Sequence, residues 1–168
     1  MSSTRAEIFE QVRARYIGLL TSVLWKLTGD RELFTEAMQY ALLGMWQHLG
    51  KLNSKKAHVY IYRIVLSANS KAWRNRIGKD GQLTCHAGFG KSPDEHLNRN
   101  ELATLVRREI TRLPDKQAKA IVMRYLEQQD YPNIATKLSC TEASARSHVS
   151  KAMATLKSKL AALALQEL

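Results

Sequence analysis

Two helical patterns separated by a three-residue break lie near the C-terminus of this 168-residue chain, and they restrict its fold more than any other feature. The first pattern covers residues 130–138, where Asp130 can cap a helix and Pro132 suits the first turn because no amide donor is lost there. Thr141, the last residue of the break, can cap a longer second helix. Two helices joined by so short a turn are typical of a helix-turn-helix, which places its second helix in the major groove of DNA.

The second helix of this motif separates apolar from polar side chains. At about 100° per residue its apolar positions share one face, and these positions are Ala145, Val149, Met153, Leu156 and Leu160. The opposite face has no carboxylate at its centre, so it can approach base edges and phosphates closely. The candidate DNA contacts are Thr141, Ser144, Arg146, Ser147, His148 and Lys151. An ordinary solvated face is the alternative, in which Lys151 only attracts phosphate and His148 is a neutral surface histidine.

The composition agrees with a helical protein that binds a polyanion. Glycine and proline are scarce, with 8 and 3 residues, and 45% of the residues are hydrophobic, which favours packed helices over a turn-rich sheet. The net charge of +11 and the isoelectric point of about 9.9 indicate nucleic acid or an acidic membrane surface as partner. No uncharged segment is long enough to span a bilayer and no signal peptide is visible, so we expect a cytoplasmic protein without membrane insertion.

Catalytic and metal chemistry find little support in the sequence. Cys85 and His86 are adjacent but have no further ligands at metal-binding spacing, and Cys140 stands apart from them. There is no glycine-rich phosphate loop and no coherent set of nucleophile and base. We therefore expect no metal, no cofactor, no catalytic residue and no enzymatic activity, with both cysteines as free thiols.

The whole chain is predicted to form two small all-α domains joined by a flexible linker. Residues 77–97 contain four of the eight glycines and show no apolar period, which is typical of a linker. The predicted domains on either side, residues 1–76 and residues 98–168, are both net basic, whereas the linker is not. Helices are expected over residues 4–27, 30–48, 55–76, 98–112 and 115–127, followed by the helix-turn-helix, and Asp30 can cap the second of these helices.

The C-terminal half resembles region four of bacterial RNA polymerase sigma factors, most of all the small extracytoplasmic-function type. The resemblance rests on Leu113–Leu126, on the sequence from Asp130 to Ala135, and on the helix from Glu142 to Ala152. It implies that this half reads the minus-thirty-five element of a promoter in the major groove and touches the flap of the polymerase beta subunit.

The N-terminal half resembles region two of the same family. The matching positions are Gly29–Glu32, Glu36, Gln39 and Trp46, with Tyr60–Ile64 and Trp73–Arg76 where the promoter-melting helix of the family lies. The resemblance implies that Glu32, Glu36 and Gln39 bind the clamp helices of the beta-prime subunit of core RNA polymerase. It also implies capture of a flipped base of the minus-ten element, a linker directed to the RNA exit path, and an anti-sigma factor as a further possible partner.

The promoter-melting segment combines aromatic and cationic side chains, which can hold single-stranded DNA by stacking and by phosphate contact. The candidate minus-ten contacts are Tyr60, Arg63, Lys71, Trp73, Arg74 and Arg76. Tyr62 belongs either to this surface or to the core. Arg63 has a structural alternative, an ion pair with a carboxylate of the second helix, and Trp46 is expected in the core.

Several departures from the family pattern indicate a divergent member. The acidic cluster of the second helix is thinner than usual, and Ser67 stands where the family often has asparagine. Ser139 replaces the turn glycine of the helix-turn-helix, at a cost of about 1 kcal/mol if the left-handed backbone is kept. The alternative function is a stand-alone helix-turn-helix regulator that binds DNA as a dimer without polymerase.

Overall fold

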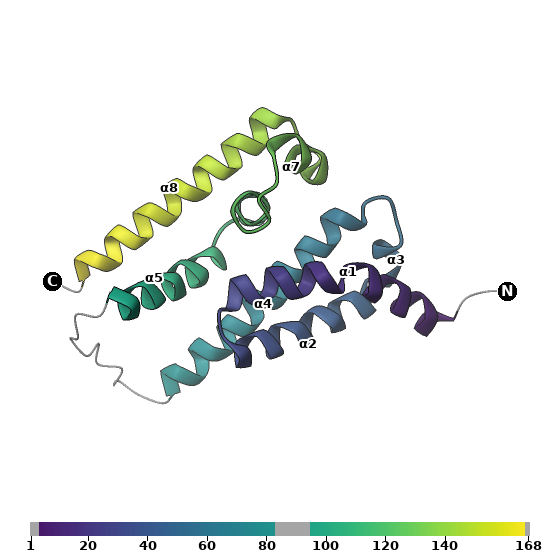
Figure 1. Cartoon of the computed structure of the whole chain (residues 1–168), viewed down its shortest axis with the longest axis horizontal. Helices are drawn as coiled ribbons and strands as arrows, with labels where there is room; N and C mark the ends of the chain where they lie inside the picture. The colour runs from purple at the N-terminus through teal and green to yellow at the C-terminus, as the bar shows by residue number, and fades with distance from the viewer. Residues whose placement is uncertain (1–3, 83–94, 167–168) are drawn as a thin grey trace.

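The computed structural model describes residues 4–82 and 95–166, and these residues form helices joined by short turns, without any strand (Figure 1). The elements are α1 (Arg5–Thr28), α2 (Arg31–Gln47), α3 (Leu49–Leu52), α4 (Ala57–Gln82), α5 (Glu95–Ile110), α6 (Asp115–Ile121), η1 (Val122–Leu126), α7 (Tyr131–Leu138) and α8 (Glu142–Gln166). The predicted all-α class is confirmed. Cys85, His86 and the centre of the predicted linker lie outside the described residues.

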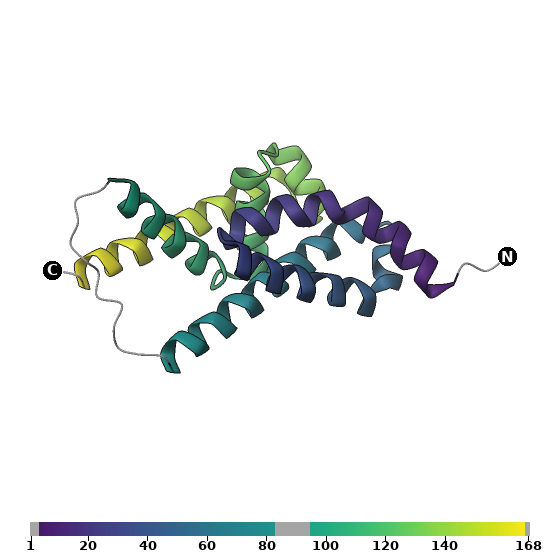
Figure 2. The same cartoon turned by 60° about the horizontal axis from the view of Figure 1, so that its bottom comes forward.

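The helices α1, α2 and α4 pack side by side as an N-terminal bundle, with the short α3 at one end (Figures 1 and 2). Each helix turns its apolar stripe toward the other two. The largest fully buried side chains of this bundle include Leu20, Leu24, Leu27, Leu33, Met45, Leu52, Ile61 and Val65. Each such side chain contributes about 1.5–3 kcal/mol when it leaves water, so this bundle has a substantial core of its own.

The helix ends follow local sequence signals. The three predicted N-caps are confirmed, since Asp30, Asp130 and Thr141 each accept a hydrogen bond from the backbone N–H three residues ahead, at 2.9, 2.9 and 3.2 Å. Helix α1 ends at Gly29, whose φ of 76° lies in the left-handed region that glycine adopts without steric cost. Asp30, the N-cap of α2, follows Gly29 directly, so only these two residues connect α1 to α2, and we call them the α1–α2 joint.

The helices α5 to α8 form a C-terminal module, in which α8 lies along α5 and packs on α6 and α7 (Figure 1). The expected α-helix over residues 115–127 is corrected in its second half, where the π-helical turn η1 replaces α-helical geometry. The backbone N–H of Glu127 bonds the carbonyl of Val122, five residues back, at 3.1 Å. This wider turn changes the direction of the side chains that follow it.

Two expected helix ends are wrong. Helix α4 continues through Gln82, and α5 begins at Glu95, so helical backbone enters both ends of the predicted linker, residues 77–97. A single glycine such as Gly78 costs a helix only about 1 kcal/mol relative to alanine, which does not stop it. The functional domain boundaries at 76 and 98 stay a prediction.

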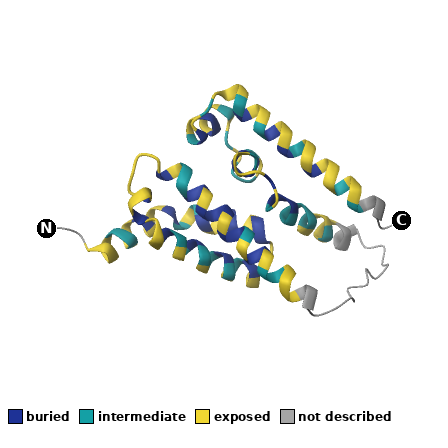
Figure 3. Cartoon of the chain, turned by 180° about the vertical axis from the view of Figure 1, so that it is seen from behind, coloured by how far each residue is buried: buried dark blue, intermediate teal, exposed yellow. Residues whose placement is uncertain are grey.

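The two modules contact each other along α4 and α1. Helices α6 and α7 contact α4, while α5 and η1 contact α1, and we call these contacts together the module interface. Buried positions lie where the helices face one another, whereas most of the outer side of α8 is exposed (Figure 3). Helix α4, which carries the predicted minus-ten contacts, therefore packs against the C-terminal module.

Candidate nucleic-acid interface

The structure places all six predicted minus-thirty-five contacts around the start of α8. Thr141, Arg146, Ser147 and Lys151 are exposed, and Ser144 and His148 are half-buried. Ala145, Val149 and Leu156 of the predicted apolar face are buried together with Ala152 on the other side of the helix, while Met153 and Leu160 are half-buried. An exposed, carboxylate-poor start of a second helix can enter the major groove, where base edges are accessible.

The turn before α8 keeps the left-handed backbone of the motif although its residue is not glycine. Ser139 has φ 53° and ψ 49°. The N–H of Ser139 bonds the carbonyl of Thr136 at 3.3 Å, and the N–H of Cys140 bonds that of Ala135 at 3.0 Å. These hydrogen bonds close the end of α7 and hold the angle between the two helices.

An aromatic ring at the start of α7 holds two guanidinium groups, which the sequence did not reveal. The Arg124 and Arg146 guanidinium carbons lie 4.8 and 4.4 Å from the ring centroid of Tyr131, within cation–π distance. Arg124 also donates to the Gln129 carbonyl at 3.0 Å, and Arg146 lies 3.5 Å from the Glu142 carboxylate. Arg124 was missed because it lies in η1, where helical periodicity does not give the direction of a side chain.

On the N-terminal module, Tyr60, Arg63, Lys71 and Arg74 lie along α4 with exposed or half-buried side chains. Lys51 donates to the Tyr60 hydroxyl at 2.6 Å and lies 4.7 Å from its ring centroid, and this hydrogen bond lowers the pKa of Tyr60. The Arg63 guanidinium lies 5.9 Å from the same ring. Among the described residues, the ion pairs within 4 Å do not include the suggested pair of Arg63 with a carboxylate of α2.

A surface cavity of about 280 Å³ opens between α2 and α4 beside this aromatic-cationic group. Its lining residues are Gly44, Gln47, His48, Tyr60, Arg63, Ile64 and Ser67. The His48 and Tyr60 rings meet edge to face at 5.6 Å. Rings for stacking, together with amide, hydroxyl and guanidinium groups for hydrogen bonding, suit a flat polar ligand such as an unstacked base.

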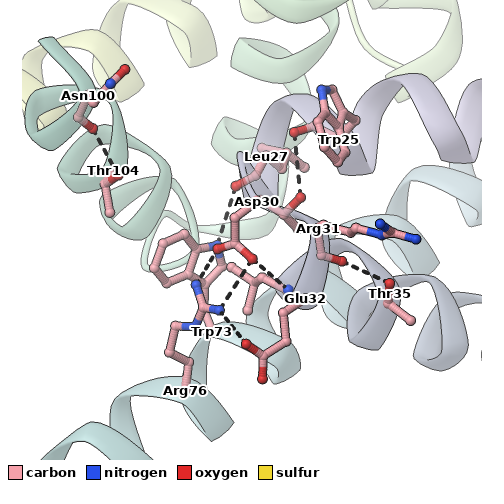
Figure 4. Close-up of polar contacts among 12 residues, drawn as sticks. Trp25, Leu27, Asp30, Arg31, Glu32, Thr35, Trp73, Arg76, Asn100 and Thr104 are labelled. Carbon is pink, nitrogen blue, oxygen red and sulfur yellow. Dashed lines mark hydrogen bonds and ion pairs between the residues drawn. The ribbon is translucent and has the colours of Figure 1, made fainter. Parts of the chain in front are cut away.

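Two residues of the predicted minus-ten set make contacts within the protein. Trp73 is only 4% exposed, and its indole N–H donates to the Leu27 carbonyl at 3.3 Å, so its ring is not open to a base. Arg76 forms an ion pair with Asp30 and lies 3.6 Å from Glu32 (Figure 4). Together these contacts join α4 to the α1–α2 joint.

Asp30 is held as a carboxylate at this joint. Burial alone would raise the pKa of Asp30, but the hydrogen bond from Arg76, the backbone N–H of Leu33 and the charge of Arg76 together lower it below the ordinary value of 3.8. One carboxylate thus caps α2 and orients α4.

The predicted polymerase contacts share the outer face of α2. Glu32, Glu36 and Gln39 line a shallow surface together with Arg31 and Thr35. The Asn75 amide of α4 donates to Glu36 at 2.7 Å, and the Tyr40 hydroxyl donates to the same oxygen at 3.3 Å. Asn75 was not singled out from the sequence, because it lies 39 positions from Glu36 and no local pattern indicates a contact between them.

Trp46 does not lie in the core as expected. Its side chain is 37% exposed, Phe9 meets it edge to face at 5.3 Å, and the Arg5 guanidinium lies 4.9 Å from its ring. The tryptophan therefore belongs to the surface of the N-terminal bundle.

The described part of the chain lacks two further features, a metal-binding cluster and a membrane-spanning helix. No cluster of three or more histidine, cysteine or acidic side chains there could hold a metal ion. None of the described helices is both long and apolar enough to cross a membrane.

Comparisons with known proteins connect both modules to one family. The model of sigma-70 region 2 matches residues 12–77, and the model of sigma-70 region 4 matches residues 103–156. The RNA polymerase sigma-H factor of Pseudomonas aeruginosa is 24% identical over 157 residues, which cover 86% of this chain and 81% of that protein. The RNA polymerase sigma-E factor of Streptomyces avermitilis is 26% identical over 159 residues, covering 92% and 85%.

A solved structure is also similar. It is that of the sigma factor RpoE in complex with the anti-sigma factor NepR from Bartonella quintana, with 18% identity, coverage of 90% of this chain and 96% of that chain, and a TM-score of 0.47.

Proposed function

Because this chain belongs to the sigma-70 family of RNA polymerase sigma factors, as a divergent member of the extracytoplasmic-function type, we propose that its two modules act on two separate promoter elements. The chain directs promoter-specific transcription initiation by RNA polymerase. The observation that carries this function is the order of the matched regions, with residues 12–77 before residues 103–156. A stand-alone helix-turn-helix regulator would leave the first region without a role.

The C-terminal module reads the minus-thirty-five duplex. The start of α8 enters the major groove, with Ser144, Ser147 and His148 toward base edges and Lys151 toward phosphate. The first helix of a helix-turn-helix crosses the DNA backbone, which places Arg124 and Arg146, held on the Tyr131 ring, beside phosphates. The aromatic ring orders the two long cationic side chains before DNA binds. They therefore lose less conformational entropy when they bind phosphate.

The N-terminal module holds the separated strand of the minus-ten element. Tyr60, Arg63, Lys71 and Arg74 contact this strand, and the cavity between α2 and α4 receives a flipped base. Trp73 and Arg76 hold α4 in place beneath this surface, because Trp73 bonds the Leu27 carbonyl of α1 and Arg76 pairs with Asp30.

The outer face of α2 binds the clamp helices of the polymerase through Glu32, Glu36 and Gln39, and the C-terminal module contacts the beta flap. The functional domains are residues 1–76 and 98–168, with residues 77–97 as the linker. The chain supplies binding surfaces, while the polymerase performs the covalent chemistry, so the protein is not an enzyme itself. It works in the cytoplasm, where promoter and polymerase are, and an anti-sigma factor is a further partner.

The decisive experiment measures binding to core polymerase and run-off transcription, with promoters identified by sequencing the transcripts. The wild type should bind core enzyme and start at a common promoter sequence. Gln39→Lys should weaken core binding by about tenfold, because it places a cation on the polymerase-binding face of α2. Gln11→Lys makes the same change on an exposed position of α1 and should leave binding unchanged. A wild type without affinity for core enzyme would refute the function.

The duplex contacts have a separate test. Lys151→Ala and Arg146→Ala should each lower affinity for the promoter duplex and reduce the slope of log affinity against log salt by about 1. Lys159→Ala, at an exposed position farther along α8, is the matched control. An unchanged salt slope in the first two variants would remove their proposed phosphate contacts.

A further inference from the structure

One helix of the N-terminal bundle contains a glycine that its backbone does not require. Gly44 lies in the last turn of α2, with helical residues on both sides. Among the glycines of residues 4–82 and 95–166 only Gly29 has a left-handed φ, so the conformation of Gly44 is open to other residues. A glycine within a helix destabilises it relative to alanine, so the reason for Gly44 lies in the space that a side chain would fill.

The missing side chain leaves room for the cavity between α2 and α4. A Cβ atom at position 44 would lie 3.2 Å from the Cγ2 methyl group of Ile64, and both residues line the cavity of about 280 Å³. Ile64 is buried among closely packed core side chains, which leave it little room to withdraw. A longer side chain at position 44 would enter the cavity, so the space for a ligand depends on Gly44.

Four polar side chains around the cavity have no polar partner within the described part of the protein. None of them takes part in a side-chain hydrogen bond or an ion pair there, and they are Gln47, His48, Arg63 and Ser67. Each of them can donate an N–H or an O–H. The cavity is therefore suited to a ligand that presents acceptor atoms.

Arg63 is held at the cavity with its donors available. Its guanidinium carbon lies 5.9 Å from the ring centroid of Tyr60, within cation–π distance. The Lys51 ammonium lies 4.7 Å from the same ring. Both charges attract the phosphates next to a captured base, whichever base it is. The planar fork of N–H groups on Arg63 remains for the base itself.

The fork of a guanidinium group distinguishes the four bases. Guanine presents two adjacent acceptors, O6 and N7, and their pairing with arginine is the commonest specific contact between a side chain and a base. Adenine has a donor, the N6 amino group, beside N7, and thymine has one acceptor beside a methyl group. Cytosine is read by a carboxylate that accepts from N4, and no aspartate or glutamate is among the residues that line the cavity. The chemistry of the cavity thus favours guanine.

We propose that the cavity between α2 and α4 takes an unpaired guanine, that Arg63 reads its O6 and N7 atoms, and that Gly44 provides the depth for its two fused rings. This inference rests on the proposed function of the N-terminal module, in which the cavity receives a flipped base. It adds which base is captured and which residues select it.

The test uses short oligothymidine strands that carry one guanine, adenine, cytosine or abasic site at the centre. A strand can slide until its single guanine occupies the cavity, so the promoter sequence need not be known. Affinity is measured by competition, both for the full chain bound to core polymerase and for the free chain. The strand with guanine should bind the wild type about tenfold more tightly than each other strand, the discrimination of one bidentate pair.

Two variants test the two residues separately. Gly44→Leu fills the cavity, so affinity for the guanine strand should fall about tenfold, to that of the abasic strand. Arg63→Gln replaces the fork by an amide, which pairs with N6 and N7 of adenine, so the preference for guanine over adenine should disappear. Circular dichroism checks that both variants are folded, and Arg63→Gln, at an exposed position, carries the test if Gly44→Leu is not.

Matched controls separate base selection from general effects. Gly18→Leu makes the same change in α1, where a Cβ atom would meet nothing within 4 Å, and it should behave as the wild type. Arg74→Gln removes a charge at an exposed position farther along α4. It should weaken the binding of all four strands alike and keep the preference for guanine, because a phosphate contact carries no sequence information.

Each outcome decides the inference. A preference for guanine that the wild type shows, both variants lose and both controls keep supports it. A preference for another base, equal affinity for all four strands, or an Arg63→Gln variant that still prefers guanine overturns it. A wild type that fails to bind core polymerase refutes the proposed function instead, and the preference of the free chain then decides whether the cavity selects guanine.

Discussion

Single side chains in this protein hold helices that are far apart in the sequence. Asp30 accepts a hydrogen bond from the Leu33 N–H as the cap of α2, and its carboxylate also pairs with Arg76 of α4 (Figure 4). The cap was predictable, because capping depends on the local pattern of residues. The pair with Arg76 was not, because it joins residues 46 positions apart, and Arg76 was assigned to DNA for its charge alone.

The ion pair of Asp30 leads to a prediction about pH. Asp30→Asn keeps an N-capping side chain but loses the charge, so it should lower the free energy of unfolding near pH 7 by about 0.5–1 kcal/mol, the range for partly exposed pairs. The pKa of Asp30 is lowered in the folded protein, so its contribution is present above the ordinary value of 3.8 and is lost as the pH falls through the folded pKa. Urea denaturation should show the difference between the two proteins shrinking as the pH falls below 3.8 and through the lowered pKa of Asp30. A constant difference would contradict the assignment.

At the scale of elements, the capped helix starts follow from local pattern, whereas the end of α4, the start of α5 and the π-helical turn η1 do not. The caps at Asp130 and Thr141 and the apolar face of α8 agree with the sequence. The π-helical turn η1 was not predictable, because the same residues fit a regular helix. The turn contacts α1 and α7, and tertiary contacts of this kind override local propensity.

The turn of the helix-turn-helix carries a measurable local cost. Ser139 has φ 53°, a conformation that is unfavourable for any residue with a Cβ atom. Ser139→Gly should raise the free energy of unfolding by about 0.5–1 kcal/mol, since the relief at this angle exceeds the extra flexibility of the unfolded chain. Chemical denaturation measures the change. Ser139→Ala keeps the Cβ and should give no gain, so a stabilised alanine variant, or a glycine variant without gain, would contradict this account.

At the scale of the whole molecule, the module interface brings the N-terminal bundle and the C-terminal module into contact. Tyr62 is buried against the other module, and Arg107 closes the end of α1. The sequence analysis left Tyr62 undecided between core and DNA, because a tyrosine in an amphipathic helix suits both environments. Glu127, which follows η1, accepts a hydrogen bond from the Tyr62 hydroxyl, and only this contact decides the role of Tyr62 in the structure.

The interface predicts how the molecule unfolds. Calorimetry of the wild type should show a single transition, with equal calorimetric and van't Hoff enthalpies, because each module loses contacts when the other unfolds. Glu127→Lys should split the curve into two transitions, one for each module. Gln128→Lys should retain the single transition, and a split curve in the wild type would show that the modules are not coupled.

The sequence alone determined the all-α class, the caps of α2, α7 and α8, the exposed face of the recognition helix and the family, since each depends on residues a few positions apart or on an ordered motif. The tertiary structure decided the burial of Trp73, the pairing of Arg76, the arginine pair around Tyr131 and the hydrogen bond from Tyr62 to Glu127. Most of these contacts join residues that are distant along the chain, so they form only when the helices that carry them pack together. A local pattern shows which side chains are suited to such contacts, but it does not show which of them meet.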